Sequence, residues 1–134
     1  MSKLSAIHIT KHTGSTPKHK ATVIFFHGSG ATGDHMREWV SLMSKNFSFP
    51  HIKIAYPTAP LQPYTPAGGM KSNVWFDRTD ISPYVPEKLD SLKLIQIDVQ
   101  NIIKQENQSG IPTNRIIVGK KKMYFYCPCA NKTV

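Results

Sequence analysis

Three segments of the chain are continuously apolar, which is typical of strands buried on both faces of a sheet. They cover residues 21–27 (Ala-Thr-Val-Ile-Phe-Phe-His), 51–56 (His-Ile-Lys-Ile-Ala-Tyr) and 115–119 (Arg-Ile-Ile-Val-Gly). Runs of β-branched and aromatic residues without polar alternation indicate parallel strands. Residues 5–10 alternate weakly and predict one further strand, in a hairpin closed by the turn residues around Pro17.

Two other segments repeat apolar residues at the spacing of a helix. The first predicts a helix of about three turns with Asp34 as its N-cap, on Met36, Trp39, Val40 and Met43. The second is expected to have Pro86 in its first turn and to end at Gly110, and it includes Leu89, Leu92, Ile95, Val99, Ile102 and Ile103.

The order of these elements predicts an α/β fold with a mostly parallel sheet and helices on its faces. A proline-rich stretch without clear periodicity, residues 57–86, separates the second apolar strand from the second helix, and we expect it to form functional surface. Ligand sites in such sheets lie at the carboxyl ends of strands. We therefore expect a site at the turns that follow Phe26 and Val118.

The composition is that of one globular domain of 134 residues, of which 40% are hydrophobic. The formal net charge of +9 is concentrated near the ends, with four lysines in residues 1–20 and four in residues 120–134. The nearly neutral middle lacks a basic face, so nucleic-acid binding is not expected. No apolar run is long enough to span a bilayer, and Cys127 and Cys129 suit neither a disulfide framework nor a zinc site. We expect a reduced, cytoplasmic setting without a metal.

The turn after the first apolar strand, residues 27–33, contains glycine at positions 28, 30 and 33. Three interpretations of it remain open. It can be a tight connection; it can be a dinucleotide loop of the form Gly-x-Gly-x-x-Gly; or it can be a loop whose backbone N–H groups bind the oxyanion of an acyl-transfer reaction. The dinucleotide interpretation lacks the acidic residue expected after the next strand, which ends at Tyr56 and Pro57.

Four blocks of sequence, in order and in register, resemble the acyl-protein thioesterase and lysophospholipase family over about residues 6–119. The blocks are His27-Gly28-Ser29-Gly30 followed by Gly33, Tyr56-Pro57-Thr58-Ala59-Pro60 preceded by Ile52-Lys53-Ile54, Asn73-Val74-Trp75-Phe76-Asp77, and Gly110-Ile111-Pro112 with Asn114-Arg115-Ile116.

The resemblance implies an α/β-hydrolase fold, no cofactor, a cytoplasmic location and hydrolysis of carboxylic esters or thioesters by a Ser-His-Asp triad. The substrate class would be acyl esters or acylated proteins. It also implies an oxyanion loop formed by His27, Gly28, Ser29 and Gly30, in which the Ser29 N–H is one of two donors. Trp75, Phe76 and Asp77 would line or brace the acyl pocket, although each alone also fits a core aromatic or a turn aspartate.

The sequence departs from the family pattern directly after Gly119. There the family has the strained Gly-x-Ser-x-Gly turn that presents the nucleophile, whereas this chain continues with Lys120-Lys121-Lys122, and the motif occurs nowhere in the sequence. All histidines precede this point, at positions 8, 12, 19, 27, 35 and 51. No catalytic residue can therefore be assigned.

These observations predict a partial α/β-hydrolase domain, residues 1–119, followed by a divergent tail, residues 120–134, as in a truncated product. We expect this form to be inactive, so its status as an enzyme stays open; the alternative is a non-catalytic module that binds an acyl group or a protein. The tail is expected to be solvated, with weak membrane-surface contact through Tyr124, Phe125 and Tyr126 as the alternative. A bare sheet edge at residues 116–118 predicts marginal stability and self-association.

Overall fold

The computed structural model describes residues 19–120 and the backbone of residues 7–10. The strands of the main sheet are β1 (Ile7–Thr10), β2 (Ala21–Phe26), β3 (Ile52–Pro57) and β6 (Ile116–Lys120), and their order is β1-β3-β2-β6. β2 is parallel to both β3 and β6. The predicted mostly parallel sheet is therefore confirmed.

The first strand pairs differently from the prediction. β1 runs antiparallel to β3, with Ile7 opposite Pro57 and Thr10 opposite Ile54, and β3 separates it from β2. The expected hairpin between the first two strands is wrong, because the order of strands depends on tertiary packing and not on local turn residues. The turn around Pro17 lies outside the described residues.

The helix α1 (Gly33–Met43) covers one face of the sheet and packs Met36 and Val40 on β3. Its N-cap is Thr32, whose Oγ1 accepts a hydrogen bond from the His35 N–H at 3.3 Å. Asp34, the predicted cap, lies in the first turn instead, where its charge still favours the positive end of the helix. Both residue types can cap a helix, so the pattern alone selected the wrong one.

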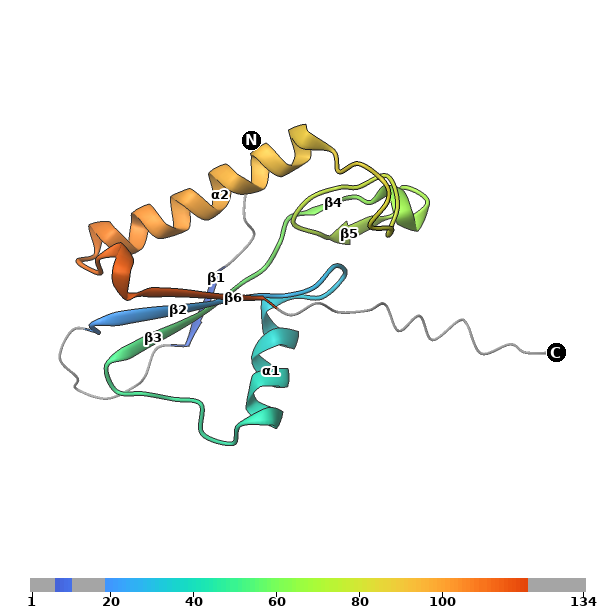
Figure 1. Cartoon of the computed structure of the whole chain (residues 1–134). Helices are drawn as coiled ribbons and strands as arrows, with labels where there is room; N and C mark the ends of the chain where they lie inside the picture. Colours follow the sequence, from blue (N-terminus) through green and yellow to red (C-terminus); the bar gives the residue numbers. More distant parts are fainter. Residues whose placement is uncertain (1–6, 11–18, 121–134) are drawn as a thin grey trace.

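The helix α2 (Leu89–Gln108) covers the opposite face (Figure 1). Its Ile102 packs in a cluster with Ile24, Phe26 and Ala55. The helix begins after Lys88, so Pro86 precedes it and does not lie in its first turn as predicted. It ends before Gly110, which adopts a φ of 95° and so confirms the predicted stop.

The segment between β3 and α2 forms a small hairpin that sequence periodicity did not indicate. It consists of β4 (Leu61–Pro63), the 3-10 turn η1 (Thr65–Ala67) and β5 (Lys71–Asn73). A second 3-10 turn, η2 (Thr113–Arg115), leads into β6. Figure 1 shows the hairpin at the end of the sheet where the loop between β2 and α1 emerges, which is where the site was expected. None of the described helices combines the length and the hydropathy that crossing a bilayer requires.

A buried polar cluster fastens the last turns of α2 to the amino-terminal end of the sheet. Glu106 is only 6% exposed; it accepts a hydrogen bond from Thr22 Oγ1 at 2.7 Å and another from Lys53 Nζ. Burial works to raise the pKa of Glu106, but the hydrogen bonds from Lys53 and Thr22 outweigh it, so the pKa lies below its usual value. The carboxylate therefore stays charged and holds helix and sheet together.

Candidate functional site

The loop that follows β2 is anchored at its first residue, His27. The imidazole is 2% exposed, its Nε2 accepts the Ala59 N–H at 2.9 Å, and its Nδ1 lies 2.7 Å from the Gly28 carbonyl oxygen. Because Nε2 is an acceptor, the proton belongs on Nδ1, which donates to Gly28. Burial lowers the pKa of His27, although the bond to Gly28 works in the opposite direction. A neutral histidine with both ring nitrogens engaged anchors the loop and is not available as a general base.

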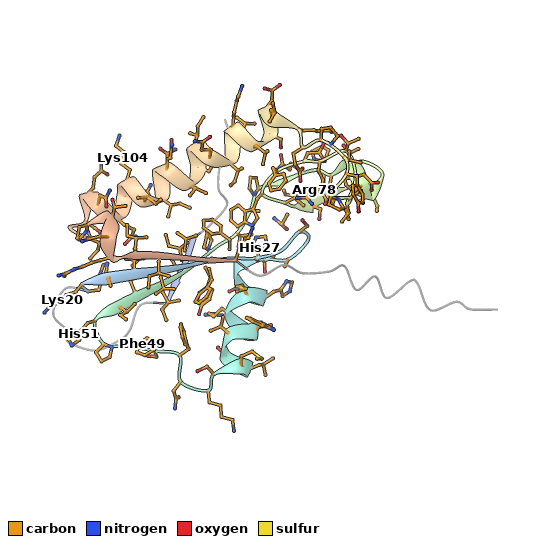
Figure 2. The ribbon with its side chains drawn as sticks, viewed as in Figure 1. Lys20, His27, Phe49, His51, Arg78 and Lys104 are labelled. Atoms are coloured by element: carbon orange, nitrogen blue, oxygen red, sulfur yellow. The ribbon has the colours of Figure 1, made fainter. Side chains whose placement is uncertain are left out.

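A second segment holds the loop from the side of β5. The Gly30 N–H donates to the Asn73 carbonyl oxygen at 2.9 Å, and the Asn73 carboxamide donates to the Ala59 carbonyl oxygen at 2.8 Å. Trp75 Nε1 donates to the His27 carbonyl oxygen at 2.8 Å. In Figure 2 His27 lies at the end of the sheet, below the segment that includes Arg78. Two segments distant from the loop in sequence, one at Ala59 and one at residues 73–75, therefore fix it in place.

Asn73 was not among the predicted site residues. It belongs to the Asn-Val-Trp-Phe-Asp block, and this position in a family-like block was the available signal. An asparagine side chain by itself does not indicate a particular function. Only the packed structure brings it next to Gly30 and Ala59.

The tight turn leaves the Ser29 amide without an internal acceptor in the part of the chain that the structure describes. The Ala31 N–H closes the turn on the Gly28 carbonyl oxygen at 3.2 Å, and Gly30 adopts a φ of 79°, which disfavours any side chain there. Ser29 itself is half-buried. A fixed, unengaged backbone N–H at the carboxyl end of a strand can donate to an external oxyanion.

Of the predicted pocket residues, Trp75 lies closest to this loop. Its ring packs edge-on against Phe26 with centroids 4.8 Å apart and lies 4.9 Å from the His27 ring. The neighbouring Phe76 ring is covered by the Arg78 guanidinium, 4.7 Å from its centroid. The structure thus brings Trp75 to the predicted oxyanion loop and directs Phe76 into a contact with Arg78.

The Asp77 carboxylate binds within its own segment. It accepts hydrogen bonds from the Thr65 N–H at 2.8 Å, from Thr65 Oγ1 at 2.7 Å, and from Lys88 Nζ. Burial works to raise the pKa of Asp77, but the bonds from Lys88 and Thr65 prevail and lower it to about 2. Its backbone N–H also donates to Ser91 Oγ at 2.6 Å. Asp77 therefore ties η1 to the start of α2, and a role beside an acyl group stays a prediction.

The third apolar strand brings a lysine to the same end of the sheet. In the parallel pairing of β2 with β6, Gly119 lies opposite Phe25, and Lys120 lies opposite Phe26. The first residue after the family-like part of the strand is thus level with the last residue before the oxyanion loop. Sequence reasoning treated Lys120 as part of the tail and not as a site residue; its position directly after an apolar strand was the available signal.

No set of three His, Cys, Asp or Glu side chains within the described ranges is arranged to hold a metal ion. Of the three open interpretations of the glycine loop, the dinucleotide one gains no support here, because the Gly30 N–H already donates to Asn73.

Comparison with known proteins gives consistent matches over this part of the chain. The sequence profile of a family described as phospholipase/carboxylesterase matches residues 11–119. Lysophospholipase-like protein 1 of Mus musculus is 44% identical over 117 residues, which cover 86% of this chain and 49% of the mouse protein. Acyl-protein thioesterase 1 of Schizosaccharomyces pombe is 34% identical over 101 residues, 75% of this chain and 44% of that protein.

The fold agrees with these sequence matches. The crystal structure of Zea mays acyl-protein thioesterase 2 superimposes with a TM-score of 0.61 at 30% identity, covering 86% of this chain and 44% of that one. The expected partial α/β-hydrolase fold is thereby confirmed. The chain spans about half the length of the curated relatives it matches.

Proposed function

Because the chain belongs to the phospholipase/carboxylesterase family, we propose that its described part forms the oxyanion-binding side of a carboxylic ester or thioester hydrolase site. Ser29 supplies one of the two oxyanion donors through its backbone N–H, and Trp75 forms a wall of the acyl pocket. The observation that carries this proposal is the unengaged Ser29 amide in a loop fixed by His27 and Asn73. Donors that are already fixed need no reorganisation as charge develops, which is why such loops accelerate acyl transfer.

We propose that the 134-residue chain by itself is catalytically inactive. An oxyanion donor assists only when a nucleophile creates the tetrahedral intermediate. The sequence has no Gly-x-Ser-x-Gly turn, and Lys120 follows the strand that leads to it in the family pattern. Burial lowers the pKa of His27, the histidine of the loop, and both of its ring nitrogens are engaged in hydrogen bonds. We therefore expect no paired nucleophile and base beside this loop to start the reaction.

The substrate class proposed for the site is acyl esters or acylated proteins, in line with the names of the relatives. A cytoplasmic location is proposed from the family resemblance alone. We place the boundary between the hydrolase-like part and the divergent tail after Gly119, where the family match ends. Weak membrane contact by residues 124–126 remains a proposal, and those residues lie outside the described part.

Self-association is supported by the outer edge of β6. Within the described residues β6 pairs on one side only, with β2, while Ile117 and Val118 are 65% and 51% exposed. An apolar, unpaired strand edge is a template for pairing with another chain. We expect sedimentation to show concentration-dependent assembly, and a monomer at all concentrations would contradict this.

A second candidate function is a non-catalytic acyl-binding module. The packing of Trp75 on Phe26 beside the loop favours it, because this apolar wall does not depend on a nucleophile. Saturable binding of a neutral long-chain alcohol by the same chain that shows no turnover would support it.

The test of the main proposal combines turnover with active-site labelling. The purified chain should hydrolyse p-nitrophenyl butyrate no faster than buffer, and a fluorophosphonate probe should label no serine. A full-length acyl-protein thioesterase serves as the positive control. Turnover that disappears when one of the chain's serines is replaced with alanine would refute the proposed lack of catalytic activity.

A further inference from the structure

We propose that Lys120 and the Ser29 N–H together form a binding site for a carboxylate, such as the head group of a free fatty acid. This inference rests on the acyl pocket proposed above and adds a preference for a negatively charged head group. It would hold the acid that ester hydrolysis releases in preference to the neutral ester.

The first step in the argument is where the strand register places Lys120. β2 and β6 are parallel neighbours, and Lys120 lies directly opposite Phe26. Residues separated by an even number of positions share one face of a strand. Ile116 packs on the cluster that contains Phe26 and Ile102, so Lys120 belongs to the face covered by α2.

Trp75 connects this position to the oxyanion loop. Its ring contacts Phe26, the register partner of Lys120, and its Nε1 donates to the carbonyl oxygen of His27. Ser29 follows two residues later, with its amide unengaged. Trp75 therefore contacts both the register partner of Lys120 and the first residue of the loop that carries the Ser29 amide, at the carboxyl end of the sheet.

The second step is the charge balance around the lysine. Lys120 is exposed and has no ion pair within residues 19–120, whereas the carboxylates of Asp77 and Glu106 are already bound to Lys88 and Lys53. An external carboxylate would meet an ammonium group that is not already paired with a carboxylate among residues 19–120. Hydrogen bonds from N–H groups to a charged oxygen are shorter and stronger than those to a neutral carbonyl.

The experiment compares dodecanoate with dodecanol on the whole chain by isothermal titration calorimetry. We expect dodecanoate to bind the unchanged chain about tenfold more tightly than dodecanol, the scale of one charge-assisted hydrogen bond. Lys120→Gln should remove this preference, and Lys120→Arg should retain most of it. Lys104→Gln is the matched control, since Lys104 is an exposed lysine on the outward side of α2, away from the loop (Figure 2).

A nuclear magnetic resonance titration reports on the second donor. The Ser29 amide proton should shift downfield with dodecanoate and much less with dodecanol. Circular dichroism establishes that each variant is folded before it is titrated.

The outcomes separate this inference from the proposed function. Equal binding of acid and alcohol, unchanged by Lys120→Gln, would overturn the carboxylate site and leave the acyl pocket standing. Loss of dodecanoate binding in Lys104→Gln would show non-specific attraction to a basic surface and would also overturn it. If neither ligand binds, both the pocket and the carboxylate site fail.

Discussion

Replacing Gly33 with alanine should displace the start of α1 from β3. A Cβ added at Gly33 would lie 2.1 Å from the Tyr56 carbonyl oxygen and 3.1 Å from Thr58 Oγ1. The Gly33 N–H also donates to Thr58 Oγ1 at 2.9 Å, so the helix cannot move away without breaking that bond. The contact is with the backbone of an interior strand, which cannot yield as a flexible side chain would.

The expected loss of stability follows from three contributions. Alanine favours a helix by about 1 kcal/mol relative to glycine. Forcing an extra methyl group into packed structure costs about 1–3 kcal/mol, and a buried amide that loses its acceptor costs a further 1–3 kcal/mol or so. The net destabilisation should be about 1–5 kcal/mol, and a value of about 3 kcal/mol would lower the melting temperature of a domain of this size by roughly 10 °C.

Urea denaturation followed by circular dichroism measures this change, with all variants at one low protein concentration. Gly68→Ala is the comparison, because a Cβ there meets no atom within 4 Å, but the φ of 66° disfavours alanine. It should cost only about 1–2 kcal/mol. If Gly33→Ala were neutral or stabilising, the close approach of α1 to β3 would be wrong.

Three further predictions concern charged and titratable groups. Because burial lowers the pKa of His27, the unfolded chain takes up a proton near the ordinary pKa of 6.5 before the folded chain does, so stability should fall as the pH drops below about 6.5. His27→Gln should weaken this pH dependence of the urea midpoint, and an unchanged dependence would contradict a buried, neutral His27. Lys88→Met should raise the pKa of Asp77 from about 2 toward its usual value of 3.8, which an NMR titration of the carboxyl group can follow. In the unchanged chain, the contribution of Asp77 to stability should be present above about pH 4 and be lost toward pH 2. Glu106→Gln should cost about 1–3 kcal/mol in urea denaturation, because it leaves a buried amide in place of a paired carboxylate, and a loss below roughly 0.5 kcal/mol would mean that the cluster does not hold α2.

The main elements were predictable because burial imposes a pattern on the sequence. The continuous apolar runs of β2, β3 and β6 and the helical spacing of α1 and α2 each follow from contact with one core. The hairpin of β4 and β5 escaped prediction because its strands are only three residues long, which is too short to show an alternating pattern.

The candidate site was predictable in part. The glycine loop could be recognised in the sequence, because His27 and the glycines after it fit a tight turn at a strand end. The residues that hold the loop could not be recognised, because the contacts of Asn73 and Trp75 with it join positions more than forty residues apart. Such contacts follow from how the sheet and the hairpin pack and have no local signature.

These long-range contacts also set an order of events during synthesis on the ribosome. β2 and β3 can pair soon after residue 57 leaves the exit tunnel, but the Gly30 amide has to wait for Asn73, and the carbonyl group of His27 for Trp75. A nascent chain would therefore hold a half-built sheet with a loose glycine loop until the hairpin has emerged. During that interval the loop is exposed to chaperones and proteases, and its final shape is acquired late.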